Sequence, residues 1–128
     1  MKIGIEHIAI YAKDTKKLSD WYKDLFDGEI VYDNKKGTYF VAFSDKSMIE
    51  FCTADSENVP TALTAPGIRH IAFSVEPDEF DALVKKVTET GAEILKDAAV
   101  NEKGIGTMFF RDIDGNILHL ISRKTPLV

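Results

Sequence analysis

The sequence predicts an α+β fold built from two tandem β-α-β-β-β modules. The first observation behind this prediction is a repeat, because the pattern G-I-x-H-I-A at residues 4–9 returns at residues 67–72. The same offset of 63 residues relates Gly28 to Gly91. The second observation is that each copy contains one stretch of helical periodicity among several short stretches of strand periodicity. Finally, a length of 128 residues suits one domain.

The first module begins with a strand and a helix. Apolar residues alternate over residues 3–11, which predicts a strand, and an i, i+3, i+4, i+7 stripe that begins at Leu18 predicts a helix. Asp14 or Thr15 can cap the start of this helix, and Gly28 suits its C-terminal cap. Three strand-like runs follow, at residues 30–32, 39–43 and 48–52.

The second module repeats this order of elements. Residues 68–75 predict a strand, and a helical stripe begins at Phe80 and ends at Gly91. Three further strand-like runs lie at residues 93–95, 107–111 and 116–121.

The two modules differ in length. Glu50 corresponds to His119 at an offset of 69 residues instead of 63, so additional residues are expected in the loop-like segment 101–106. We expect a single domain over residues 1–128. Its parts are, in order, module 1 (residues 1–54), a linker (residues 55–66) and module 2 (residues 67–128).

The composition argues against several classes of function. A net charge of −5 disfavours nucleic-acid binding, which needs a basic surface. No apolar run approaches the ~20 residues that span a bilayer, and residues 1–7 read as a strand rather than a signal peptide. The single cysteine, Cys52, excludes an intrachain disulfide, so we expect a cytoplasmic protein.

All three histidines of the chain lie at repeat-matched positions. His7 and His70 share one position on the first strand of each module, and His119 corresponds to Glu50 on the last strand. A lone strand histidine is usually structural, but the joint pattern predicts that these four side chains hold a single divalent metal ion. Imidazole with carboxylate suits Zn, Ni, Fe, Mn or Co better than Ca or Mg. The alternative is a site that keeps these residues but holds no metal.

Two further residues are candidates for substrate binding. Tyr39 could bond a substrate oxygen or pack in the core, and Arg111 could pair with an anionic substrate. Arg69 is adjacent to His70 and, by strand alternation, should face the opposite way. For Cys52 two interpretations remain, a small buried apolar residue and a side chain that approaches the metal.

A resemblance to a known family lies in four segments, residues 5–10, 21–26, 68–73 and 110–120. The chain resembles, over essentially its whole length, the vicinal oxygen chelate superfamily of glyoxalase I, fosfomycin-resistance thiol transferases, methylmalonyl-CoA epimerase, extradiol dioxygenases and bleomycin-binding proteins. The resemblance implies the glyoxalase-like fold, in which paired modules curl into a cup-shaped mixed sheet around a metal, and many such proteins are homodimers. It implies metal positions at His7, Glu50, His70 and His119.

The chain departs from the family pattern at three positions. In the motif D-P-D-G-N-x-x-E, Ile113 replaces the proline and His119 replaces the glutamate, which in glyoxalase I is thought to move the substrate proton. Tyr11 replaces an arginine that helps hold glutathione in relatives of glyoxalase I. These changes leave Glu50 as the only obvious base, and therefore as the expected catalytic residue.

The resemblance implies a metal-dependent enzyme with a small oxygen-rich substrate. The leading expectation is isomerase or lyase chemistry on a 2-oxo compound or its thiol adduct, as in lactoylglutathione lyase. A thiol transferase and a dioxygenase of the same superfamily are alternatives. A different function, sequestration of a bleomycin-type antibiotic, is disfavoured because all four ligand-type residues are retained. We expect a homodimer, and neither a nucleic-acid nor a membrane partner.

Overall fold

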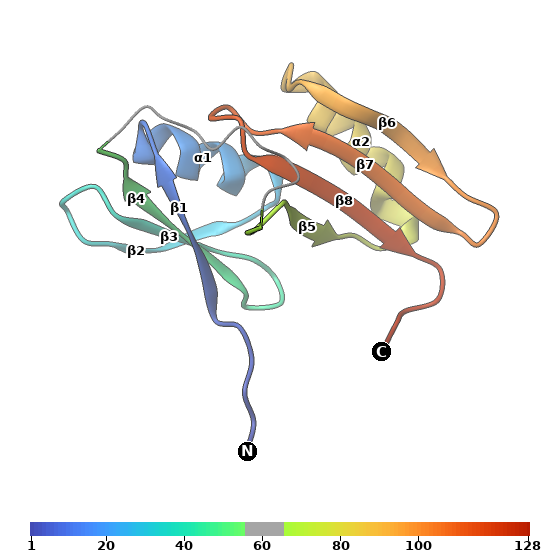
Figure 1. The fold of residues 1–128 in the computed structure, drawn as a ribbon, viewed down its shortest axis with the longest axis horizontal. Coiled ribbons are helices and arrows are strands. Elements are labelled where there is room, and N and C mark those ends of the chain that lie inside the picture. The colour runs from blue at the N-terminus through green and yellow to red at the C-terminus, as the bar shows by residue number, and fades with distance from the viewer. Residues whose placement is uncertain (56–65) are drawn as a thin grey trace. The chain divides into compact units, whose positions relative to one another are not determined.

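The computed structural model of the chain describes residues 1–55 and 66–128, and these residues form two compact units (Figure 1). The first unit is Met1–Asn58 and the second is Val59–Val128. Almost all of the predicted linker, residues 55–66, lies outside the described residues. Within residues 1–55 and 66–128, no helix is both long and apolar enough to cross a membrane.

The first unit contains a helix and a four-stranded mixed sheet. Its elements are β1 (His7–Ala12), α1 (Thr15–Leu25), β2 (Glu29–Asp33), β3 (Tyr39–Ala42) and β4 (Met48–Thr53). The sheet order is β1-β4-β3-β2, with β1 parallel to β4 and the other neighbours antiparallel. The first strand of the module therefore lies beside the last one.

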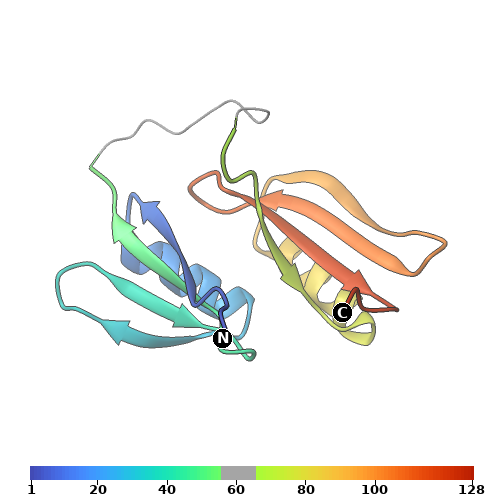
Figure 2. The same ribbon diagram turned by 60° about the horizontal axis from the view of Figure 1, so that its bottom comes forward.

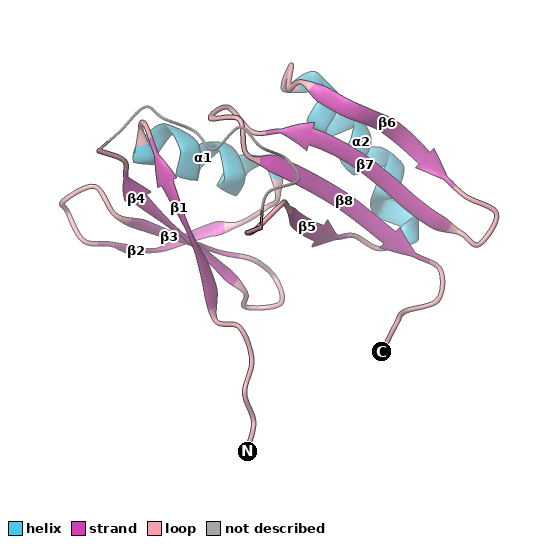
Figure 3. Cartoon of the chain, in the orientation of Figure 1, coloured by secondary structure: helices cyan, strands magenta, loops and turns pink. Residues whose placement is uncertain are grey.

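The second unit has the same connectivity, as Figure 3 shows. Its elements are β5 (Ile71–Ser74), the short 3-10 helix η1 (Pro77–Glu79), α2 (Phe80–Glu89), β6 (Ile94–Val100), β7 (Ile105–Arg111) and β8 (Ile117–Arg123). The sheet order is β5-β8-β7-β6, and again the first and last strands are parallel neighbours. These two sheets confirm the predicted α+β class and both β-α-β-β-β modules.

The additional residues of module 2 lengthen a hairpin. β6 runs to Val100, well beyond the predicted strand at residues 93–95, and β7 already begins at Ile105. The predicted loop at residues 101–106 is therefore a tighter turn, in which Asn101 Oδ1 accepts hydrogen bonds from the backbone N–H groups of Lys103 and Ile105. The sequence pattern missed most of β6 because its residues are largely exposed and do not alternate.

In each unit the helix lies along one face of its own sheet (Figure 2). In the first unit Tyr22 of α1 packs against Phe51 of β4, with ring centroids 5.1 Å apart, and both side chains are fully buried. In the second unit Phe110 and Leu118 are equally buried. Side chains on a strand alternate between faces, so the residues between these core positions occupy the face without a helix, here called the open face.

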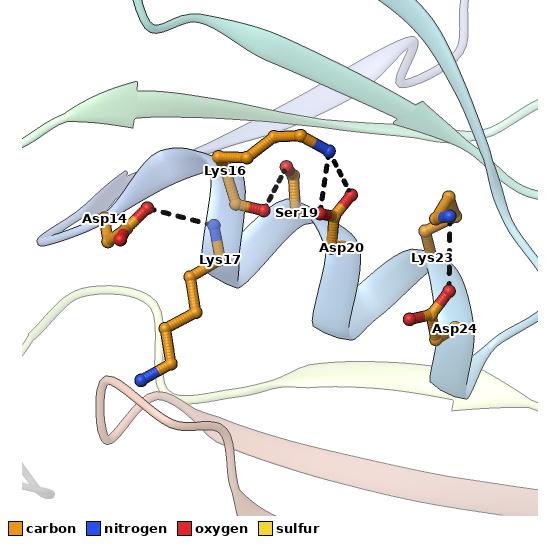
Figure 4. A network of polar contacts seen from close by, with 7 residues as sticks. All are labelled: Asp14, Lys16, Lys17, Ser19, Asp20, Lys23 and Asp24. Atoms are coloured by element: carbon orange, nitrogen blue, oxygen red, sulfur yellow. Dashed lines mark hydrogen bonds and ion pairs between the residues drawn. The ribbon is translucent and has the colours of Figure 1, made fainter.

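The start of α1 is capped as its sequence predicts. Asp14 accepts a hydrogen bond from the backbone N–H of Lys17 at 3.0 Å, which satisfies one of the free donors of the first turn (Figure 4). One turn further on, the Lys16 ammonium contacts both carboxylate oxygens of Asp20 at 2.7 Å (Figure 4). This exposed pair contributes little to stability, so the cap and the buried face are what hold the helix in place.

The two repeat-matched glycines have different roles. Gly91 takes a left-handed backbone conformation after α2, with φ of +76°, as expected of a C-terminal cap. After α1 that conformation falls on Asp27, with φ of +50°, while the Gly28 N–H donates to the Lys23 carbonyl at 2.9 Å, so Gly28 takes part in the cap without adopting the left-handed conformation. A Cβ at Gly28 would lie 2.7 Å from Cγ1 of Val41. Gly28 is therefore required by close packing against β3.

We predict that Gly28→Ala lowers the free energy of unfolding by about 1–3 kcal/mol through overpacking. Gly91→Ala should cost about 1 kcal/mol through backbone strain, and Gly91→Asn should cost less because asparagine tolerates the left-handed region. Gly4, whose added Cβ would meet nothing within 4 Å, provides the control. Urea unfolding of the variants measures these differences, and a Gly28→Ala variant as stable as Gly4→Ala would contradict the packing role.

Candidate metal centre

In the first unit, His7 and Glu50 lie side by side on the open face. β1 and β4 are parallel neighbours, with Ala9 opposite Glu50, so His7 is one row away from the carboxylate. The His7 Nε2 atom is 3.9 Å from Glu50 Oε1. The Nδ1 atom of the same ring is 2.9 Å from the Glu6 carboxylate, which can only accept, so Nδ1 donates. In the neutral ring Nε2 then has its lone pair available, close to Glu50.

In the second unit, His70 and His119 make the matching pair. β5 and β8 are parallel neighbours with Ala72 opposite His119, and His70 immediately precedes β5. The two imidazole rings are 5.2 Å apart between centroids and nearly perpendicular, at 89°. Nδ1 of His70 and both ring nitrogens of His119 are buried, and none has a hydrogen-bond partner among the residues that the structure describes.

The electrostatic surroundings of His119 favour its neutral form. Burial lowers the pKa of His119, and the positive charges of His70, Arg123, Lys96 and Arg69 lower that pKa further. A neutral imidazole is the form that binds a metal. Imidazole and carboxylate are donor types that suit a divalent first-row transition metal. Each unit by itself brings two candidate donors together, and within residues 1–55 and 66–128 no group of three or more candidate ligands gathers.

Each candidate pair has an aromatic neighbour that the sequence reasoning did not single out. Phe40 lies opposite Glu50, and its ring meets that of His7 at 5.3 Å and 68°. Phe109 lies opposite His119, and these two rings stack at 4.1 Å and 9°. The available signal was the repeat itself, since Phe40 and Phe109 match at the same offset as Glu50 and His119.

The structure places Tyr39 away from the candidate ligands. Tyr39 lies opposite the buried Phe51, and Lys16 of α1 reaches to 5.8 Å from the centre of its ring. It therefore occupies the helix-covered face, whereas its neighbour Phe40 points to the open face. Of the two interpretations offered by the sequence, packing is the one that this position favours.

The two arginines make different contacts. Arg111 has its guanidinium engaged at the β7–β8 turn, where Nη1 donates to the Gly115 carbonyl at 2.8 Å and Nε lies 3.4 Å from Glu93. Arg69 was expected to face away from His70, but its guanidinium lies 6.0 Å from the centre of the Phe109 ring. Arg69 precedes β5, so strand alternation does not fix its direction.

Cys52 belongs to the open face of the first unit, two residues from Glu50 on β4. It is half-buried, and burial together with the adjacent Glu50 carboxylate raises the pKa of its thiol. At neutral pH this favours the thiol over the thiolate, and the thiolate is the metal-binding form. Cys52 is therefore a weaker candidate ligand than the histidines.

Comparison with known proteins shows the family. Residues 4–120 match the Glyoxalase/Bleomycin resistance protein/Dioxygenase superfamily, and the chain belongs to it. The chain is similar to the fosfomycin resistance protein FosX of Listeria innocua, with 26% identity over 91% of this chain and 87% of the relative. It is also similar to the metallothiol transferase FosB of Staphylococcus haemolyticus, with 23% identity over 91% of this chain and 81% of the relative.

Solved structures show the same fold. The crystal structure of FosX from Listeria monocytogenes superposes with a TM-score of 0.78 and 23% identity, over 99% of this chain and 97% of that one. A mutant of that FosX was solved with Mn(II) and 1S,2S-dihydroxypropylphosphonic acid, with a TM-score of 0.75 and 23% identity, over 99% and 94% of the two chains. The glyoxalase-like fold is thus confirmed, and the expected cofactor class, a divalent metal ion, is the one bound by this relative.

The pKa of His119 predicts how stability depends on pH. Because this pKa is lower in the folded chain, the unfolded chain binds more protons as the pH falls. The contribution is fully present above the unfolded value of about 6.5 and is lost as pH falls through the folded pKa. We expect the urea concentration at the midpoint of unfolding of the metal-free protein to fall as the pH is lowered from about 7.5 to about 5. The decrease should be smaller in His119→Gln. Equal pH profiles would contradict the burial of this imidazole.

Proposed function

We propose that this chain is a divalent-metal-dependent enzyme that adds a thiol or water to a small, oxygen-rich, negatively charged substrate. The proposed metal-binding residues are His7, Glu50, His70 and His119, and Glu50 is the proposed base. The observation that supports this most directly is the repeat-matched pair of ligand-type side chains on the open face of each unit. The sequence leaves open whether the donors come from one chain or from two copies in a homodimer.

The surroundings of each donor support metal binding. The Glu6 carboxylate holds His7 in the tautomer that leaves Nε2 free toward Glu50. The unpartnered ring nitrogens of His70 and His119 are costly to bury unless something binds them. When bound, a divalent ion of this class polarises neighbouring oxygens of a substrate and stabilises negative charge on them.

Glu50 favours addition or transfer over the isomerase or lyase chemistry expected from the sequence. Isomerisation of a 2-oxo compound moves a proton between two carbons, which the family does with two carboxylates, and His119 replaces one of them. Addition needs one base. Glu50 accepts the proton of the thiol or water, the sulfur or oxygen bonds to a substrate carbon, and the departing oxygen takes the electrons of the broken C–O bond and then a proton. The name of the relative FosB, a metallothiol transferase, supports this choice.

The charges near His119 support an anionic substrate. Arg69, Lys96 and Arg123 all act on His119, although the whole chain has a net charge of −5. None of the three forms an ion pair with a carboxylate within the described part of the chain. Lys96 lies opposite Phe109 on β6, and Arg123 lies on the same face of β8 as His119. Unpaired cations beside a candidate metal favour a substrate with carboxylate, phosphate or phosphonate groups.

We expect protein purified without chelator to contain one divalent metal ion per proposed site, measured by elemental analysis.

His119→Ala should weaken metal affinity at least about tenfold, as loss of a ligand does. Glu50→Gln should reduce turnover about 100-fold or more, because a glutamine cannot accept the proton. Glu89→Gln, on the exposed side of α2, is the matched control.

The reaction is tested by incubating the metal-loaded protein with fosfomycin, with and without a thiol, and identifying the product by mass spectrometry. A water adduct or a thiol adduct would support the proposal and decide between the two nucleophiles. If Glu50→Gln also loses the metal, the main role of Glu50 is that of a metal ligand and not that of a base. If the wild-type protein binds no metal and forms no product, but binds a bleomycin-type antibiotic, the proposed enzymatic function is wrong and a sequestering function is favoured.

Charge variants test the proposed substrate class. Arg69→Gln, Lys96→Gln and Arg123→Gln should each raise KM for an anionic substrate by roughly two- to fivefold, the scale of one partly exposed ion pair. The effect should shrink as salt is added, because exposed charges are screened. Lys85→Gln on α2 is the control, since Lys85 pairs with Glu89 on the helix surface. Unchanged KM in all three variants would contradict an anionic substrate.

A further inference from the structure

We propose that Phe109 is the positioning residue for the two histidines of the second unit, and that it replaces the hydrogen-bonded carboxylate that orients His7 in the first. This inference rests on the metal site proposed above. Phe109 stacks on His119 at 4.1 Å with the planes 9° apart, and meets His70 edge-on at 5.6 Å and 83°. One ring therefore contacts both imidazoles, which are themselves perpendicular to each other.

The second histidine pair needs such a support because it lacks the usual one. The ring of a metal-bound histidine is commonly fixed by a hydrogen bond from its other nitrogen to a carboxylate, a carbonyl or water. His119 would hold a metal through one ring nitrogen and leave the other for such a hydrogen bond, yet neither nitrogen has a partner among the described residues. Rotation about χ2 of histidine is broad. Stacking on Phe109 is the contact that selects the ring plane of His119.

The first unit shows the alternative arrangement at the matched positions. There Glu6 accepts a hydrogen bond from His7 Nδ1 at 2.9 Å, and the matched ring, Phe40, meets His7 only edge-on at 5.3 Å. The residue that matches Glu6 in the repeat is Arg69, which cannot accept a hydrogen bond. Its guanidinium instead lies over Phe109, at 6.0 Å from the ring centre. The loss of an acceptor and the change from an edge-on contact to ring stacking thus occur together.

The strand register shows that Phe109 is placed for this role. Phe109 lies directly opposite His119 on the antiparallel neighbour β7. Its sequence neighbours Met108 and Phe110 are buried on the helix-covered face, whereas Phe109 is only half-buried on the open face. Phe109 is therefore not needed for the core beneath α2, and a substitution there can alter the histidines without removing core packing.

The test compares Phe109→Leu with Phe109→Tyr, which keeps the ring. Competition with a chelator measures metal affinity, and the visible spectrum of the Co(II)-loaded protein reports ligand geometry. We expect about a tenfold loss of affinity and an altered Co(II) spectrum in Phe109→Leu, within the range seen for outer-shell residues, and near-normal values in Phe109→Tyr. Phe40→Leu should lose less affinity, because Glu6 still orients His7.

Phe110→Leu is the stability control, since it removes buried core contacts on the other face. It should lower the melting temperature without changing the affinity of the folded protein. Equal affinities for wild type and Phe109→Leu would overturn the proposal, as would an equal loss in Phe109→Leu and Phe109→Tyr. If the wild type binds no metal, the proposed function fails, and NMR relaxation of the His119 ring in the metal-free variants still decides the positioning role. An equally ordered ring in Phe109→Leu would overturn it.

Discussion

The candidate pairs depend on one constraint, the parallel pairing of the first and last strands of each module. β1 lies beside β4, and β5 lies beside β8. Parallel strands cannot be joined by a tight turn, so a helix and two further strands fill the connection. This long connection brings residues far apart in sequence into neighbouring rows on one face of the sheet. It places His7 next to Glu50, and by the same register it places His70 next to His119. Without that pairing, neither unit has two donors within reach of each other.

The two-residue period of the strands explains why much of this could be predicted from the sequence. Phe51 and Leu118 face the helices, so Glu50 and His119 face the other way. Local pattern and the internal repeat were therefore sufficient for the α+β class and for both modules. The repeat by itself also relates the four positions to one another. The repeat shows which positions of the two modules are equivalent, but this does not determine which metal or which substrate is bound.

The features that the sequence could not predict depend on contacts between distant residues. Gly28 is a glycine because Val41, on another strand, leaves no room for a Cβ. The face of Tyr39 was ambiguous because large residues occupy both faces of β3, so alternation gave no direction. Arg69 stands just before β5, where its long side chain is free to reach Phe109. In each case a neighbour in space decides the outcome, and no local pattern contains that neighbour.

Two departures from symmetry at the candidate ligand positions and their neighbours act on charge in the same direction. At the matched positions, module 1 has Glu6 and Glu50 where module 2 has Arg69 and His119. Two carboxylates in each module would repel an anionic substrate and compete with it for a cation. With the carboxylates confined to module 1, a proton acceptor remains there, while module 2 offers imidazoles and unpaired cations. As a consequence, module 2 lacks the acceptor that would orient a histidine. An aromatic ring can orient the histidine instead without introducing a negative charge. On this view the stacking of Phe109 and the positive surroundings of His119 are two consequences of the same exchange of residues.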